Sequence, residues 1–264
     1  YIEHYLHNDY VLYGGEESDN YKPQTTMADI AEQMQSIPGM GTVEVNRSAK
    51  VRLPFDAELY APFIETEDDP ESLATFYETT TNSEAQYGAP LISVNSDMIK
   101  LYNKTARRKI DIDAFEKGEV CLIGYVDSIS ASERMTDKTL TLVNDQTGGK
   151  RQITVGAAMM RTEQSAITAG YYWTLGGAPE AIFVSDAVMD DLFPDAEISC
   201  IIADAEKGKE TEVTPYVQRI VKENPVIAGS DIKSVEGSEF KKSMLSLEVI
   251  GGGISIILIL IGVV

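Results

Sequence analysis

Histidine and cysteine are the scarcest functional residue types in this chain of 264 residues. Its two histidines, His4 and His7, lie three positions apart. Two ligands do not make a zinc site, which takes four, and little else remains for histidine-based catalysis. The two cysteines, Cys121 and Cys200, are too few for a disulfide framework. Because both lie in apolar runs, we expect small buried side chains, and a single disulfide between them stays open.

Basic residues are also in short supply. The chain has 22 Lys plus Arg against 42 Asp plus Glu, which gives a formal net charge of −20. Nucleic-acid phosphates reward clustered Lys and Arg, so nucleic acid is excluded as a partner. Hydrophobic residues make up 43% of the chain, which is ordinary globular usage and argues against wholesale disorder.

Enzyme motifs are missing as well. No G-x-S-x-G nucleophile elbow occurs, and Gly148-Gly149-Lys150 lacks the upstream glycine of a phosphate-binding loop, where Asn144 stands. The acidic stretch 65–71 lacks the ordered spacing and the glycine of a calcium loop. We therefore expect no catalytic residue, no cofactor, no metal and no enzyme activity.

The N-terminal part of the chain reads as a β-α-β unit. Asp9–Gly14 is apolar and aromatic and predicts a strand. Thr25 or Thr26 then caps a helix with Ile30, Met34 and Ile37 on one face, which Pro38-Gly39 ends. Two further strands are predicted at 42–45 and 51–53.

A second unit of the same kind lies near the other end. It comprises a strand at 196–203, a charged turn, a helix at 213–223 that Pro225 ends, and a strand at 230–235. Shifting the first unit by 187 residues places Ile30 on Val217, Met34 on Val221 and Pro38 on Pro225. Two such units can share one sheet.

The middle of the chain predicts mostly strands with short helices. Asn95 or Ser96 caps a helix, Ser185 caps another, and Asp111 and Asp113 read as one face of a strand. The fold class is therefore α+β with two lobes. Residues 1–56 and 196–238 form an α/β lobe of two β-α-β units, residues 57–195 form an inserted β-rich lobe, and residues 239–264 are a stalk and the start of a truncated transmembrane helix.

The last sixteen residues, Val249–Val264, carry no charge. As a helix they extend about 24 Å, and a membrane span needs about 20 residues. We interpret them as part of a transmembrane helix, against the alternatives of a buried soluble helix, a tail anchor or a lipid-anchor signal. Gly237, beside the last predicted strand, is a candidate hinge, against the alternative of a plain strand-to-helix turn. The residues assigned to membrane insertion are Val249, Ile250, Ile254, Ile256, Ile257, Leu258, Ile259, Leu260 and Ile261.

Several segments resemble FtsX-like ABC transporter permeases. The stretch FKKSMLSLEVIGGGISIILILIGVV, Phe240–Val264, is similar to the stalk and start of their second membrane helix. Residues 1–13 resemble the exit from a first membrane helix into a strand, and 34–45 the helix ending in Ile-Pro-Gly. Residues 110–125 resemble the family's "F.G..VLI" segment, and 138–143 with 153–157 its strand pair.

The resemblance implies an extracytoplasmic domain like the MacB periplasmic core, with an α/β "porter" lobe and an inserted "sabre" lobe. Its implied partners are a separate cytoplasmic ABC ATPase, the lipid bilayer and a second permease copy. The domain would couple ATPase-driven helix movement to export or envelope signalling, through stalks at Tyr1–Leu6 and Ser238–Val249, or bind a substrate or partner. The chain has no nucleotide-binding motif and no complete span, so transport is not assigned to it alone. The alternative is a membrane-anchored binding or sensor module with no transport role.

The apolar end provides a first prediction. If Val249–Val264 belongs in a bilayer, its apolar surface has no partner in the isolated chain. Removal of all residues after Glu248 should then raise solubility and leave the melting temperature nearly unchanged. Thermal denaturation and sedimentation of both forms measure this, and a large fall in melting temperature would show that the tail belongs to the core.

Overall fold

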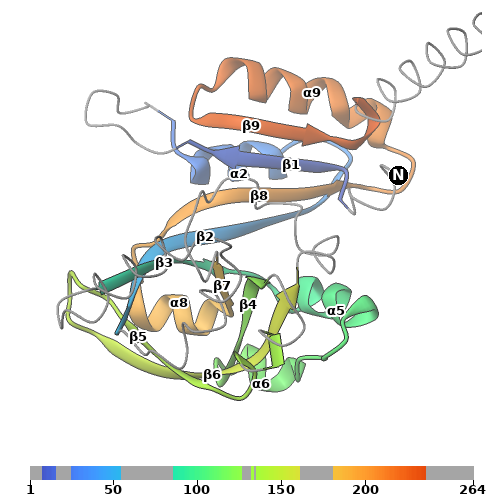
Figure 1. Ribbon diagram of the computed structural model, residues 1–264. Coiled ribbons are helices and arrows are strands. Elements are labelled where there is room, and N and C mark those ends of the chain that lie inside the picture. The colour runs from blue at the N-terminus through green and yellow to red at the C-terminus, as the bar shows by residue number, and fades with distance from the viewer. Residues whose placement is uncertain are drawn as a thin grey trace, which may run out of the picture.

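The computed structural model describes residues 8–15, 25–54, 86–126, 132–133, 135–160 and 181–235. One sheet in the order β3-β7-β4-β6-β5-β2-β8-β1-β9 runs through them (Figure 1). Its strands are β1 (Tyr10–Gly14), β2 (Met40–Pro54), β3 (Gln86–Ser93), β4 (Val120–Val126), β5 (Thr139–Val143), β6 (Lys150–Met160), β7 (Ala181–Val184), β8 (Glu197–Ala205) and β9 (Ile227–Ile232). The helices are α2 (Met27–Gln35), α5 (Ser96–Thr105), α6 (Ile112–Glu116), α8 (Asp186–Leu192) and α9 (Glu210–Glu223).

The two predicted β-α-β units interlock in one part of this sheet. Strand β8 lies between β1 and β2 and is antiparallel to both, and β1 likewise lies between β8 and β9. Each unit, β1-α2-β2 and β8-α9-β9, is thus split by a strand of the other, which is the ferredoxin-like arrangement. We call these strands, β2, β8, β1 and β9, the four-strand sheet.

Helices α2 and α9 cover one face of the four-strand sheet. Thr26 begins α2 in a capping box, in which its hydroxyl accepts from the Asp29 N–H and the Asp29 carboxylate accepts from the Thr26 N–H. Ile30, Met34 and Ile37 are all buried, as predicted, but α2 ends at Gln35, so Ile37 lies just after the helix and not on its face. With the inward side chains of the strands they form the first core cluster, which contains Tyr10, Leu12, Met27, Ile30, Met34, Ile37, Ile201, Ala203, Val213, Val217, Ile227 and Ile232.

Strand β2 belongs to two parts of the molecule. On one edge its residues 40–48 pair with β8 and its Arg52 pairs with Val143 of β5. On the other edge its residues 48–54 pair with β3. The pairing β3–β2 therefore closes β2, β3, β7, β4, β6 and β5 into a ring, which we call the strand ring (Figure 1).

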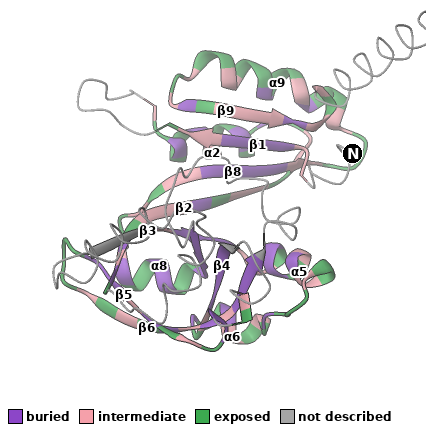
Figure 2. Cartoon of the chain, viewed as in Figure 1, coloured by how far each residue is buried: buried purple, intermediate pink, exposed green. Residues whose placement is uncertain are grey.

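The interior of the strand ring is apolar. Alternate side chains point inward, because successive residues of a strand face opposite sides. With α8 they form the second core cluster, which includes Val51, Leu53, Ala89, Leu91, Cys121, Ile123, Leu140, Leu142, Ile153, Val155, Ile182, Val184, Val188, Met189 and Leu192. The buried residues in Figure 2 gather accordingly on the strands and on the side of α8 that meets them.

A third cluster joins the ring to the four-strand sheet. It holds the buried residues of α5 and α6 and the outward residues of β4, β6 and β7, among them Tyr102, Phe115 and Phe183. Val11, Cys200 and Ile202 belong to it too, although they come from β1 and β8. The two parts therefore share apolar core as well as strand β2.

Some local predictions were wrong. The strands expected at 42–45 and 51–53 are one strand, since β2 continues through the polar residues between them. The last strand lies at 227–232 rather than at 230–235. Asp111 and Asp113 are not on a strand: Asp111 is the N-cap of α6 and accepts from the Ala114 N–H. The lobe boundaries at 56/57 and 195/196 stay a prediction.

Two glycines of the strand ring have positive φ but differ in the space around them, so substituting each of them tests how tightly the ring is packed. A Cβ on Gly118 (φ +69°) would lie 2.6 Å from the Val188 Cγ2 of α8, whereas one on Gly148 (φ +73°) would meet nothing within 4 Å. Gly148→Ala should cost about 1–2 kcal/mol of unfolding free energy, from backbone strain alone. Gly118→Ala should cost about 1–3 kcal/mol more, because the clash adds to the strain. Denaturant unfolding of both variants measures the difference, and equal losses would contradict the packing of α8.

Candidate functional site

The two segments that lead to the chain ends leave the four-strand sheet at one corner. Tyr10 at the start of β1 is the pairing partner of Ile232 at the end of β9. Just beyond them, the Lys233 N–H donates to the Asp9 carbonyl at 3.0 Å. The residues before Asp9 and after Lys233 therefore start side by side. We call this corner the exit.

Two carboxylates fasten the exit to the sheet, Asp204 of β8 and Asp9 just before β1. Asp204 accepts the Asn8 side-chain amide through Oδ2 and the Asp9 N–H through Oδ1, both at 2.8 Å. Asp9 in turn accepts the Ala205 N–H at 3.2 Å. This reciprocal pair of aspartates ties the first residues of β1 to the last residues of β8.

Helix α9 braces the exit from above the sheet. The Tyr10 hydroxyl lies 3.1 Å from the Glu210 carbonyl, to which it donates, and 3.1 Å from Thr214 Oγ1. Thr214 Oγ1 also lies 3.2 Å from Ser234 Oγ, two residues past β9. Hydroxyl groups thereby link three elements at the exit: the start of β1, the first turns of α9 and the residues just after β9.

Burial at the exit shifts the pKa values of two groups, Asp9 and Tyr10. Burial raises the pKa of the Asp9 carboxyl; the Ala205 N–H lowers it, the Asp204 carboxylate raises it again, and the result lies above the ordinary 3.8. Burial likewise raises the pKa of the Tyr10 hydroxyl, and the hydrogen bond between it and Thr214 lowers that pKa in part. Both groups favour their neutral forms mainly because they are buried, and nearby carboxylates add to the effect.

The second part of the site is the point where β2 passes from the four-strand sheet to the strand ring. The register with β8 shifts between Asn46 and Arg47, which marks a bulge. The Arg47 guanidinium reaches Asp186 and Asp190 of α8, each at 2.8 Å. The Arg47 side chain is 18% exposed, whereas those of Asp186 and Asp190 are 60% and 66% exposed, so the guanidinium is largely covered and both carboxylates remain in contact with water. We call this double ion pair the Arg47 clamp.

Polar groups under the bulge are satisfied. The Arg47 N–H donates to the buried Ser93 hydroxyl of β3 at 3.1 Å, and the Ser199 hydroxyl donates to the Asn46 carbonyl at 3.3 Å. The Asn46 amide contacts the Met98 sulfur of α5 at 3.9 Å. The bulge thus stays hydrogen-bonded to β3, β8 and α5, as a buried backbone requires.

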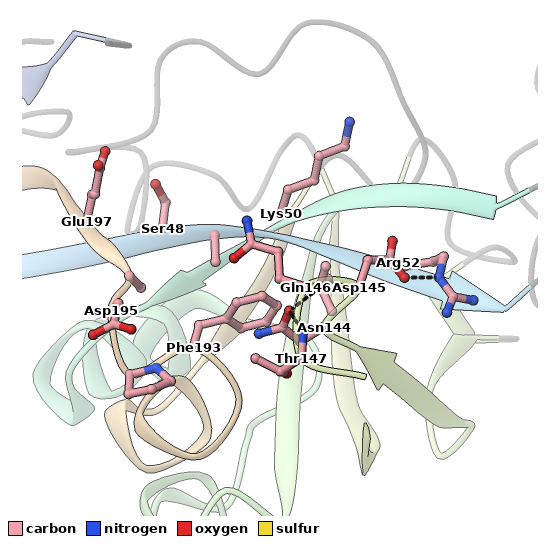
Figure 3. A pocket seen from close by; sticks show the side chains of 14 residues that line it. Ser48, Lys50, Arg52, Asn144, Asp145, Gln146, Thr147, Phe193, Asp195 and Glu197 are labelled. Atoms are coloured by element: carbon pink, nitrogen blue, oxygen red, sulfur yellow. Dashed lines mark hydrogen bonds and ion pairs between the residues drawn. The ribbon is translucent and has the colours of Figure 1, made fainter. Parts of the chain in front are cut away.

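Beside the clamp a hollow of about 610 Å³ opens along β2 (Figure 3). The residues 48–52 of β2 form one wall, the turn 144–147 a second, and the loop 193–197 a third. Arg52 forms an ion pair with Asp145 at one end of it. The buried Asn144 donates to the Leu192 carbonyl at 2.7 Å and so joins the turn to the end of α8.

The residues singled out from the sequence as a site lie outside the described residues. This holds for the hinge Gly237, the stalks at 1–6 and 238–249, and all the membrane-insertion residues from Val249 to Ile261. Within the described ranges, no helix is long and apolar enough to cross a bilayer. In the same ranges no group of three His, Cys, Asp or Glu residues could hold a metal ion.

Both cysteines are described, and each is a free buried thiol. They belong to different core clusters, Cys121 inside the ring and Cys200 on β8, so the disulfide left open by the sequence is not formed. Burial raises the pKa of the Cys121 thiol to about 12 and raises that of Cys200 as well. Neither is suited to act as a nucleophile, which has to be a thiolate.

Solved structures provide the comparison with known proteins. The chain is similar to the periplasmic region of MacB from Actinobacillus actinomycetemcomitans, with 9% identity, a TM-score of 0.45 and coverage of 91% of this chain and 95% of that one. It is also similar to the extracellular domain of the noncanonic ABC-type transporter YknZ from Gram-positive bacteria, with 9% identity, a TM-score of 0.38 and coverage of 78% and 88%. No protein-family model and no curated protein matches the chain.

The raised pKa of Asp9 predicts a pH-dependent gain in stability. A carboxyl whose pKa is higher in the folded chain stabilises the fold when protonated, and this contribution is lost as the pH rises through the folded pKa. Asp9→Asn keeps an oxygen for the Ala205 N–H and removes the charge. We expect its melting temperature to exceed that of the unchanged chain at pH 7 and the advantage to shrink as the pH falls toward 4.

The control for this measurement is Asp195→Asn, because Asp195 is exposed and has no hydrogen-bond or ion-pair partner among the described residues. It corrects for the general benefit of removing one negative charge from a chain of net charge −20. An equal gain in both variants at every pH would show that Asp9 is not strained by its surroundings.

Proposed function

We propose that this chain is the extracytoplasmic domain of an ABC transporter permease, and that it passes movement of the membrane helices to a distal lobe. The observation that carries the proposal is the exit, where the Lys233 N–H bonds to the Asp9 carbonyl and both chain-end segments begin side by side. Two segments that start at one corner can enter one membrane together. The resemblance of Phe240–Val264 to the start of a membrane helix supports the same conclusion.

The proposed path of movement follows the sheet. A displacement at the exit acts first on β1 and β9, then on β8, which is paired with both β1 and β2. Strand β2 carries it into the strand ring, and the Arg47 clamp joins the same strand to α8 inside the ring. In this proposal the four-strand sheet is the part driven by the membrane and the ring is the part that responds.

The partners follow from the same proposal. A cytoplasmic ABC ATPase acts through the rest of the permease, the lipid bilayer holds the segments beyond the exit, and a second permease copy completes the assembly. The domain lies on the extracytoplasmic side of the cell membrane and performs no catalysis itself. Its acidic surface, with a net charge of −20 for the chain, is unsuited to nucleic acid.

The test uses the full-length permease together with its ATPase. Arg47→Met keeps the aliphatic stem and removes both ion pairs of the clamp, at a cost of about 1–3 kcal/mol of unfolding free energy. We expect the domain to fold, ATP hydrolysis to continue and the transport or resistance phenotype to fall. The ratio of transport to ATP hydrolysed is the measurement.

The matched control is Arg108→Met. Arg108 also binds an aspartate, Asp137 at 2.7 Å, but both side chains are more than half exposed and the pair does not involve β2. The control should keep the ratio of transport to hydrolysis. An unchanged ratio in a folded Arg47→Met variant would show that β2 does not carry the movement. If deletion of residues 8–235 left the phenotype intact, the coupling role would be wrong and a binding or sensor module would replace it.

A further inference from the structure

One edge of β2 is left without a partner strand for three residues. Ser48 is the last residue paired with Glu197 of β8, and Arg52 is the first paired with Val143 of β5. Residues 49–51 between them pair with no described strand on this edge, although β3 pairs with them on the other edge. At about 3.4 Å per residue the gap is about 10 Å long. The hollow described above lies along it.

Charged side chains of both signs line this gap, and among the described residues they have no ion-pair partner. Ser48 and Lys50 lie on the same face of β2, and Glu197 stands opposite Ser48 in the register, so Lys50 and Glu197 are diagonal neighbours with Cβ atoms about 7–8 Å apart. Neither forms an ion pair, and Asp195, which lines the same hollow, forms none either among the described residues. Figure 3 shows Glu197 and Asp195 toward one end of the hollow and Lys50 farther along β2, with its ammonium directed away from Gln146 and Phe193.

Both polar and apolar side chains line the hollow, and this combination suits a small polar molecule that also has an apolar part. The Gln146 amide and the Thr147 hydroxyl border it, and Phe193 and Ala49 provide an apolar floor that packs against the interior of the ring. A volume of about 610 Å³ lies within the usual range of small-molecule sites, which is about 300–1,000 Å³.

We propose that this hollow binds a small zwitterion of dipeptide size. Its ammonium group would lie at Glu197 and Asp195, its carboxylate at Lys50, and its backbone along the unpaired edge of β2, as an added strand does. An extended dipeptide spans about 7 Å from end to end, so it fits within the unpaired gap of about 10 Å on β2. The proposal concerns a site on the domain and does not depend on its coupling role.

The test is titration calorimetry of the 264-residue chain with L-alanyl-L-alanine. We expect saturable binding at millimolar ligand, with one site per chain. The N-acetylated and the C-amidated forms each lack one charge, and each should bind about tenfold more weakly, because one charge-assisted hydrogen bond is lost.

Variants assign the two ends of the ligand. Lys50→Gln should weaken binding of the free dipeptide about tenfold and remove the difference between it and its amide. Glu197→Gln should also weaken binding of the free dipeptide about tenfold, and it should remove the difference between the free dipeptide and its N-acetylated form. Lys222→Gln and Glu223→Gln, which change exposed charges on α9, should bind as the unchanged chain does. Absence of saturable binding, equal affinity of free and capped dipeptides, or full affinity in both Lys50→Gln and Glu197→Gln would each overturn the proposal.

Discussion

The fold depends on the requirement that the backbone of β2 find hydrogen-bond partners along its fifteen residues. No single neighbouring strand provides all of these partners. On one edge β8 pairs with the first half of β2, and β5 pairs with it at Arg52. On the other edge β3 pairs with the second half. Because β2 is shared, the four-strand sheet and the strand ring cannot separate without exposing a row of unpaired backbone groups. The ring closes for the same reason, since β2 is both its first and its last strand.

The alternation of side chains then decides how the cores are divided. Tyr10 and Leu12 face α2 and α9, while Val11 between them faces the cluster of α5 and α6. Strand β8 behaves likewise, with Ile201 on one side and Ile202 on the other. Both faces of the four-strand sheet are therefore buried near the ring, and separating the two parts would expose apolar side chains at about 25 cal/mol per Å².

Local signals predicted the parts of this fold that depend on neighbours in sequence. The apolar spacing of Ile30 and Met34 and the caps at Thr26 and Asn95 are found as expected, because caps and helix faces are set within one or two turns. Ser185 occupies the expected N-cap of α8, yet its hydroxyl makes no cap bond there, and its Oγ is buried without a partner among the described residues. The sequence did not predict β2 as one strand, because Asn46 and Arg47 interrupt its apolar pattern. The partners of Arg47, Ser93 and Asp186, lie far away in sequence. The exit and the clamp are missed for the same reason: Asp9, Asp204 and Arg47 look like ordinary surface charges until the pairing of distant strands brings them together.

The same pairing indicates where the molecule can bend at least cost. A rotation across β1, β8 and β9 would break ladders of antiparallel hydrogen bonds, each with a net contribution of about 1 kcal/mol, and would open the apolar cluster at Val11 and Cys200. At Asn46–Arg47 the ladder already shifts register, and just beyond it residues 49–51 have no partner on one edge. Bending there breaks few backbone bonds, and the Arg47 clamp with the Asn144 contact to the Leu192 carbonyl opposes it. A molecule that occupied the unpaired edge of β2 would stiffen this bend, so binding in the hollow and movement of the ring would be linked in both directions.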